Sequence, residues 1–213
     1  RRRDERANKM DYSTNVISIV ANEHDMCSVL RSMADNILSS EFGEYSDIDS
    51  SSIAASGTSK ELFDLIEYGV EGYAPAAFCA EDKCCDVPAL TRLSSQNGFR
   101  ILTVVFDCSG MPCVQGVSDF ASNLPKGEYA FCYYNAGEFD GYSDVNEIIE
   151  NVKGERRALD DWSDFADKED LRERHESLQQ AGISQITDSL ELAVASAVLA
   201  CPEEILEGDS FEW

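Results

Sequence analysis

Five of the eight cysteines fall in two short segments, and their spacing is the clearest candidate for chemistry in the sequence. The segments read Cys79-x4-Cys84-Cys85 and Cys108-x4-Cys113. Four thiolates from two loops are a ligand set that Zn²⁺ accepts, although four intervening residues are the upper limit of a zinc knuckle and no histidine lies nearby. A structural zinc, a disulfide between Cys108 and Cys113, and buried thiols all fit the pattern. We favour buried, reduced thiols, because several cysteines lie inside expected helices or strands.

A catalytic thiol or hydroxyl needs a base, and the sequence offers only two histidines. His24 lies at an expected helix start and His175 in a charged helical segment, and both settings are typical of solvated surfaces. Thiol exchange at Cys108 and Cys113 is not expected, because that chemistry uses Cys-x-x-Cys at a helix N-terminus. The sequence contains no phosphate-binding loop, dinucleotide fingerprint or serine nucleophile elbow. We therefore predict no catalytic residue, metal ligand or cofactor. A hydrolase built from scattered carboxylates or from Cys108 and Cys113 is the alternative.

Acidic residues dominate the composition. The chain has 41 Asp and Glu against 17 Lys and Arg, a net charge of −24. Residues 1–10 carry a net +3, residues 11–144 a net −15, and residues 145–213 a net −12. Such a charge repels nucleic-acid phosphates and anionic lipid. It favours a basic protein surface as the partner, and in a narrower form it indicates mimicry of a nucleic acid.

The C-terminal residues combine carboxylates with aromatic side chains. Acidic groups would steer the segment towards a basic partner, and aromatic groups would anchor it in a pocket. A frayed, solvated terminus is the competing interpretation. The candidate interaction residues are Glu203, Glu204, Glu207, Phe211 and Trp213.

Neither a membrane span nor a secretory signal is expected. The longest apolar runs are shorter than the roughly 18 residues that a spanning helix requires, and no signal-peptide pattern is visible. Eight cysteines in 213 residues are too few for a disulfide scaffold. We expect a soluble protein of a reducing intracellular compartment, either the cytoplasm or an organellar lumen.

The stretch from Asn97 to Asn135 contains the longest apolar runs and predicts the central sheet. Strands are expected near 99–107, 112–117 and 128–135. The first has apolar residues on both faces, which is typical of an interior strand. The turn-forming residues 107–110 predict a hairpin that returns through 112–117, and a short helix from Ser118 to Leu124 follows before Pro125. The fold class is therefore α+β, with a small, mainly antiparallel sheet.

Amphipathic helices are expected around this sheet. Apolar residues recur with helical spacing from Met26 to Leu38. Thr58 and Glu61 form a capping box, which predicts a helix continuing to about Val70. Residues 16–20 fit either a strand or a helical turn. Further helices are expected over 86–97, 143–152, 155–181 and 186–201.

The segment SDFASNLPKGEYAFCYYN, residues 118–135, resembles the helix–Pro–strand element of actin-depolymerising-factor homology domains, which a hairpin also precedes. The resemblance covers about 40 residues. It implies a further long strand and a basic actin-binding helix. This sequence instead has an acidic loop and an expected helix from Val145 to Val152, so actin binding is not carried over.

Three regions follow from these patterns. Residues 1–14 are expected to be a flexible basic arm, residues 15–154 an α+β core, and residues 155–213 an acidic helical extension and tail that pack on the core. We predict a non-enzymatic acidic interaction protein that inhibits, scaffolds or links a larger assembly by binding a basic protein surface.

Overall fold

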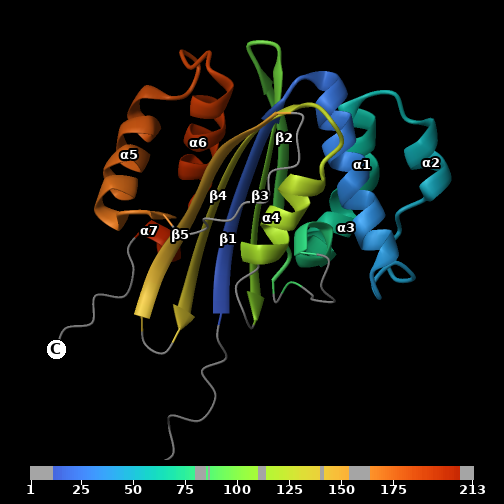
Figure 1. Cartoon of the computed structure of the whole chain (residues 1–213), viewed down its shortest axis with the longest axis horizontal. Helices are drawn as coiled ribbons and strands as arrows, with labels where there is room; N and C mark the ends of the chain where they lie inside the picture. Colours follow the sequence, from blue (N-terminus) through green and yellow to red (C-terminus); the bar gives the residue numbers. More distant parts are fainter. Residues whose placement is uncertain are drawn as a thin grey trace, which may run out of the picture.

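The chain folds into a six-stranded sheet with helices on both faces (Figure 1). This computed structural model describes residues 12–79, 85, 87–109, 114–139, 142–153 and 164–206. The strand order is β2-β3-β1-β4-β5-β6, and every pairing is antiparallel. The predicted α+β class and antiparallel sheet are therefore confirmed. The elements are β1 (Tyr12–Ala21), α1 (Glu23–Ser39), α2 (Ser50–Ala55), α3 (Ser59–Cys79), β2 (Leu90–Gln96), β3 (Phe99–Ser109), α4 (Val114–Asn123), β4 (Glu128–Phe139), β5 (Tyr142–Lys153), β6 (Asp164–Phe165), α5 (Lys168–Ala181), α6 (Ser189–Ala200) and α7 (Glu203–Leu206).

Strand β1 is buried on both of its faces. Successive side chains of a strand point to opposite faces. Ile17 and Ile19 therefore pack towards α1, α3 and α4, whereas Val16 and Val20 pack towards α6. All four are at most 1% exposed. The expectation that the strand at 99–107 is interior to its sheet is also confirmed, because β3 lies between β2 and β1. Its face towards α1 and α3 is buried, whereas Thr103 and Val105 on the other face are only partly buried.

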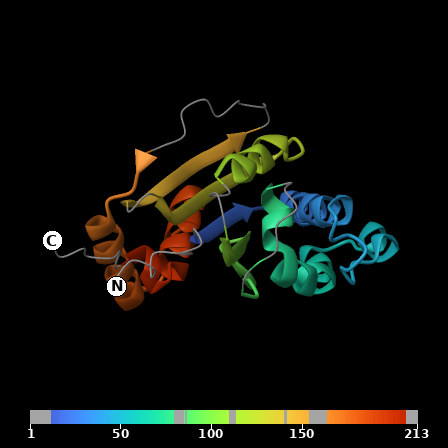
Figure 2. The same ribbon diagram turned by 90° about the horizontal axis from the view of Figure 1, so that it is seen from below.

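The helices form two layers, one on each face of the sheet. Helices α1, α3 and α4 cover one face and α6 with α7 the other, with α5 packed outside α6. Figure 2 shows the two layers from below, on opposite sides of the strands. Each layer closes a separate apolar core, so the sheet is the middle of three layers.

A buried polar cluster interrupts the apolar face under α1 and α4. The Asn15 Oδ1 accepts hydrogen bonds from the Tyr133 hydroxyl and the Asn135 amide, both at 2.8 Å. The Asn15 amide donates to the carbonyl oxygen of Ser13 at 3.2 Å. The side chains of Asn15, Tyr133 and Asn135 are 0% exposed. One asparagine on β1 thus links β1 to β4 within the sheet.

The predicted strand at 112–117 is wrong, because helix α4 already begins at Val114. Val117, Phe120 and Ala121 are buried with helical spacing. A Cβ on Gly116 would lie 2.4 Å from the Cα of Cys79, so only glycine lets this helix approach the end of α3. The sequence showed poor helix formers here, and packing on α3 overrides that propensity.

The predicted helix over 86–97 is also wrong within the described residues, which form β2 from Leu90 to Gln96. Asn97 and Gly98 have φ values of 52° and 83° and join β2 to β3. Both values suit a two-residue hairpin turn, for which Asn-Gly is the strongest signal. These two residues end a strand rather than a helix.

The predicted helix over 143–152 is replaced by β5, which pairs with β4 along its whole length from Tyr142 to Lys153. The spacing of Val145, Ile148 and Val152 fits a helix as well as a partly alternating strand. Pairing with the long strand β4 decides between the two. The ambiguous segment at 16–20 is likewise a strand, β1.

Helix α3 extends beyond its predicted end near Val70 to Cys79. It is broken at Tyr73, where φ is −137° and ψ is 36°, two residues before Pro75. Proline removes an i→i−4 hydrogen bond and bends a helix. The chain continues helically after the kink, because Ala74, Ala76 and Phe78 are buried in the core.

We expect Asn15→Ala to lower the free energy of unfolding by about 2–4 kcal/mol, because it removes a buried acceptor that Tyr133 and Asn135 share. Urea unfolding followed by circular dichroism measures this change. Tyr133→Phe, which removes one of the two donors, should cost only about 1 kcal/mol. A loss below about 0.5 kcal/mol for Asn15→Ala would contradict the role of the cluster.

Candidate functional site

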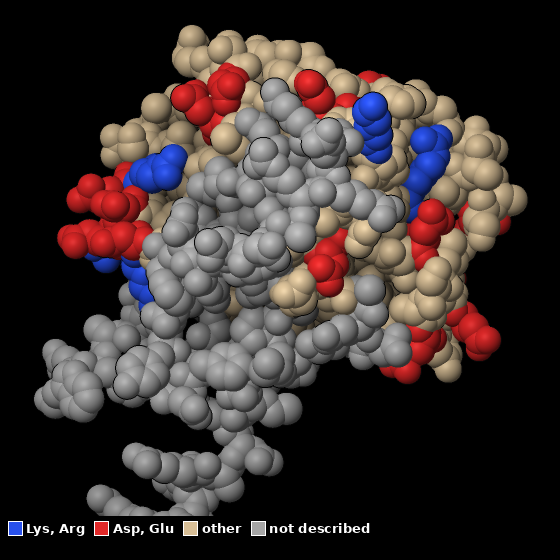
Figure 3. Space-filling view, viewed as in Figure 1, with Lys and Arg blue, Asp and Glu red and all other residues tan. Residues whose placement is uncertain are grey.

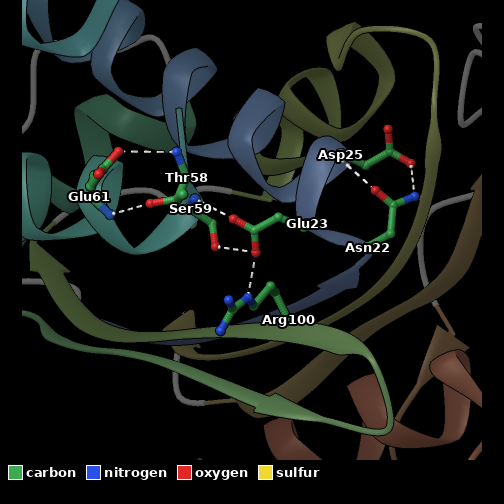
Figure 4. Close-up of polar contacts among 7 residues, drawn as sticks. All are labelled: Asn22, Glu23, Asp25, Thr58, Ser59, Glu61 and Arg100. Carbon is green, nitrogen blue, oxygen red and sulfur yellow. Dashed lines mark hydrogen bonds and ion pairs between the residues drawn. The ribbon is translucent and has the colours of Figure 1, made fainter. Parts of the chain in front are cut away.

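Helices α1 and α3 begin side by side, and a carboxylate joins them to the sheet (Figure 4). The Glu23 carboxylate accepts hydrogen bonds from the Ser59 backbone N–H at 2.6 Å and from the Ser59 hydroxyl at 2.9 Å. It also accepts from Nε of Arg100, on β3, at 2.5 Å. The Glu23 side chain thus contacts Ser59, which is 36 positions away in sequence, and Arg100, which is 77 positions away.

Local sequence explains both helix starts. The Asn22 side chain caps α1 by accepting from the Asp25 backbone N–H at 2.9 Å. At the start of α3, the Glu61 N–H donates to the Thr58 hydroxyl at 3.2 Å, and the Thr58 N–H donates to the Glu61 carboxylate at 3.3 Å. This confirms the predicted capping box. Carboxylates near helix N-termini are stabilised by unpaired N–H groups and by the helix dipole.

The ionisation of Glu23 follows from these contacts. Partial burial acts to raise the pKa of its carboxyl group, but hydrogen bonds from the Ser59 N–H, Arg100 and the Ser59 hydroxyl outweigh it, so the pKa lies below its usual value. The side chains of Glu23 and Arg100 remain 43% and 35% exposed. A carboxylate with a lowered pKa and three donors is a poor general base, so the junction is suited to fixing α3 on the sheet.

An open cavity of about 550 Å³ lies beside this junction. Thr58 and Glu23 form one side, and the tip of the β2–β3 hairpin, with Asn97 and Phe99, forms another. Among the described residues of its lining, the charged side chains are those of Glu23 and Arg100, which are paired with each other.

The outer face of α3 combines carboxylates with exposed apolar side chains. Tyr68 is 79% exposed and Leu65 38% exposed, one helical turn apart. Tyr45, in the α1–α2 connection, is 73% exposed. That connection packs on α3, because a Cβ on Gly69 would lie 2.7 Å from Cδ1 of Ile48. We call this surface the α3 stripe, and it consists of Glu61, Asp64, Leu65, Glu67, Tyr68 and Glu71.

The helical layer that carries the α3 stripe is strongly acidic. Residues 12–79 contain 11 acidic and two basic residues. Lys60 pairs with Asp64 at 2.7 Å, and Arg31 donates to the Ser56 carbonyl at 2.8 Å, so both cations already have partners. In Figure 3, the charged side chains visible at the lower right are acidic, among uncharged ones. The sequence showed the charge, but only the fold placed it beside exposed tyrosines.

The predicted C-terminal interaction residues lie only partly within the described structure. Glu203 is exposed at the start of α7, and Glu204 lies in the same short helix. The following Ile205 and Leu206 are buried in the core beneath α6. The remaining predicted residues, Glu207, Phe211 and Trp213, lie outside the described residues. The grouping of these five residues stays a prediction.

The cysteine segments do not form a described metal site. Cys108 is 0% exposed, with its sulfur 3.1 Å from the Ser13 hydroxyl. Cys79 is 5% exposed at the end of α3, whereas Cys84 and Cys113 lie outside the described residues. No three metal-ligating side chains cluster in the described part of the chain. The zinc and disulfide alternatives therefore stay untested hypotheses.

The two histidines lie on separate helices. His24 is exposed in the first turn of α1, and His175 is half-buried on α5. Neither lies on α3 or in the lining of the cavity beside Glu23. No described helix has the length and apolar character needed to traverse a bilayer.

Comparison of the chain with protein-family models, with curated proteins and with solved structures finds no match.

We expect Glu23→Gln to lower the free energy of unfolding by about 1 kcal/mol at pH 7. Because the folded-state pKa of Glu23 is lowered, its contribution is fully present above the unfolded pKa and is lost as pH falls through the folded value. The difference between wild type and variant should therefore shrink towards pH 3. Urea unfolding at several pH values tests this, with Glu173→Gln on α5 as an exposed control. An equal difference at pH 7 and pH 3 would contradict it.

Cys201 should resist alkylation in the folded protein. Burial raises the pKa of its thiol to about 12, so roughly one thiol in ten thousand is ionised at pH 8. Mass spectrometry after iodoacetamide treatment should find Cys201 modified only when denaturant is present. Rapid labelling of the native chain would show that this core opens.

Proposed function

We propose that the protein is a non-enzymatic acidic interaction protein, an inhibitor, scaffold or linker subunit of a larger assembly, which binds a basic protein surface through the α3 stripe. The observation that carries this proposal is the acidic composition of the layer containing α1–α3: residues 12–79 have 11 acidic residues and two basic residues. Both of those basic residues are engaged within the layer. An approaching cationic surface would meet carboxylates with few competing cations.

Exposed apolar side chains supply binding affinity, which charge alone does not provide. Electrostatic attraction mainly steers association, whereas buried aromatic anchors carry much of the affinity. Tyr68, Leu65 and Tyr45 are large side chains exposed on this acidic layer. Helix α3 is held by Glu23 and by its capping box, so the stripe is presented on a fixed element and loses little entropy on binding.

The proposal also includes two terminal segments and a cellular compartment. Residues 12–14 belong to β1, so the predicted basic arm is limited to residues 1–11, which lie outside the described residues. This arm and the C-terminal residues Glu203, Glu204, Glu207, Phe211 and Trp213 would provide additional contacts within an assembly. A reducing compartment, either the cytoplasm or an organellar lumen, is the proposed location. The buried thiols of Cys27 and Cys201 are compatible with such a compartment.

A narrower form of the proposal is nucleic-acid mimicry. Here the carboxylates of the stripe would occupy the positions of phosphates on a basic nucleic-acid-binding protein. Duplex DNA would then compete with the chain for its partner, and binding would weaken steeply with salt. A partner without a basic cleft would exclude this form and leave the broader proposal in place.

The partner should be identified by cross-linking and affinity capture of the full chain at low salt, followed by elution on a salt gradient. Reversing two charges with Glu67→Lys and Glu71→Lys should weaken binding of that partner by about 10- to 100-fold, because each reversal adds repulsion to lost attraction. Tyr68→Ala should weaken it at all salt concentrations.

A charge-matched control separates a specific surface from net charge. Glu173→Lys with Glu176→Lys changes the total charge equally but alters exposed residues of α5, in the other layer. This variant should retain binding to within about threefold. Equal weakening by both double variants, or binding that ignores ionic strength, would refute the α3 stripe as the docking surface.

A further inference from the structure

Strand β2 lies at one edge of the sheet and pairs only with β3 among the described strands. No other described strand pairs with its other edge, and just before β2 the Ala89 N–H donates to the Glu71 carbonyl oxygen of α3 at 2.8 Å. An exposed edge of this kind is a template for an added strand, unless charge, proline or a covering element blocks it. Figure 2 shows the green strands β2 and β3 at the lower side of the sheet, with the two helical layers to their left and right.

The helices cover the two faces of β2 unequally. Helix α3 packs on one face, where Leu93 contacts the core. On the other face, α6 packs on β1, β4 and β3 and leaves a groove of about 290 Å³ beside β2. We call it the β2 groove, and its main lining residues are Leu90, Arg92, Ile101, Val105, Ser196 and Leu199.

The lining of the β2 groove is incomplete in two respects. Leu90 is 72% exposed, and Val87 just before the strand is 51% exposed, so apolar surface is left open to water at this edge. Ser196 is 8% exposed, and its hydroxyl has no hydrogen-bond partner within the described structure. Buried hydroxyl groups normally have a partner, so a ligand atom or water is expected beside Ser196.

One charged side chain distinguishes the β2 groove from the rest of this acidic chain. Arg92 is exposed on β2 and forms no ion pair with any described residue. No acidic residue is found among the described residues that line the groove. A partner that fits here would therefore carry a carboxylate, the opposite of what the α3 stripe attracts.

We propose that the free edge of β2 and the β2 groove bind an extended segment of a partner protein as an added strand. Backbone groups would pair with β2, and side chains at alternate positions would enter the groove. The segment would have apolar residues at those positions and an Asp or Glu facing Arg92. A volume near 290 Å³ is at the lower limit for small-molecule pockets, which favours a row of side chains over an enclosed ligand.

The hairpin register indicates which backbone groups are available. Gln96 and Phe99 flank the two-residue turn as a hydrogen-bonded pair. Along an antiparallel ladder, hydrogen-bonded pairs alternate with pairs whose backbone N–H and C=O groups point outwards. The N–H groups of Thr91, Leu93 and Ser95 therefore point away from β3. Proline is tolerated on an edge strand where its missing N–H would face outwards, so Ser95→Pro removes a donor while keeping the sheet.

The test uses a displayed library of random 12-residue peptides selected against the full chain at physiological salt. Enriched peptides should alternate apolar residues and contain Asp or Glu. By fluorescence anisotropy, a selected peptide should bind Ser95→Pro and Leu90→Asp at least about tenfold more weakly than wild type. Arg92→Glu should prefer the peptide in which lysine replaces its acidic residue. Circular dichroism checks that each variant is folded.

Tyr68→Ala is the matched control, since it removes an exposed apolar side chain from the α3 stripe and should leave peptide binding unchanged. Its effect on the basic partner tests the other proposal separately. An absence of enriched peptides, enrichment without alternation, or binding that ignores Ser95→Pro and Leu90→Asp would overturn the β2 proposal. Dimerisation of the chain that Ser95→Pro abolishes would overturn it too, by identifying a second copy as the occupant.

Discussion

Burial of the central strands on both faces is the constraint on which the rest of the structure depends. Strand β1 has isoleucine on one face and valine on the other, and β3 and β4 continue both apolar surfaces. A sheet that is apolar on both faces needs a helical layer on each side, since either face alone would expose a large apolar area. The early helices form one layer and the C-terminal helices the other.

Polar contacts then determine how the layers sit on the sheet. Glu23 ties the start of α3 to α1 and, through Arg100, to β3. On the other side, Gln96 donates to the carbonyl oxygens of Ile183 and Ile186, which holds the hairpin tip against the α5–α6 connection. Within the sheet, Asn15 joins β1 to β4. A few directional bonds thus fix a geometry that apolar packing alone leaves loose.

The two proposed binding surfaces are consequences of this arrangement. Because helices cover both faces of the described sheet, helix exteriors and strand edges are available for recognition. The α3 stripe uses an exterior rich in carboxylates, and the β2 groove uses an edge that α6 does not cover. Because their charges are opposite, they would select different partners, as expected of a protein that links components of an assembly.

The sequence by itself determined the fold class, the strands β3 and β4, the start of α1 and the Thr58–Glu61 cap, because their signals are local runs, periods and side-chain caps. It also determined the acidic surface. Only tertiary structure decided the segments at 90–96, 114–117 and 142–153, where periodicity was ambiguous and pairing or close packing overrode propensity. Tertiary structure also decided which surfaces form. Glu23 contacts Arg100, and β2 lies beside α6, although the partners in each case are far apart in sequence. A sequence contains no local signal for contacts of this kind, because long-range packing creates them.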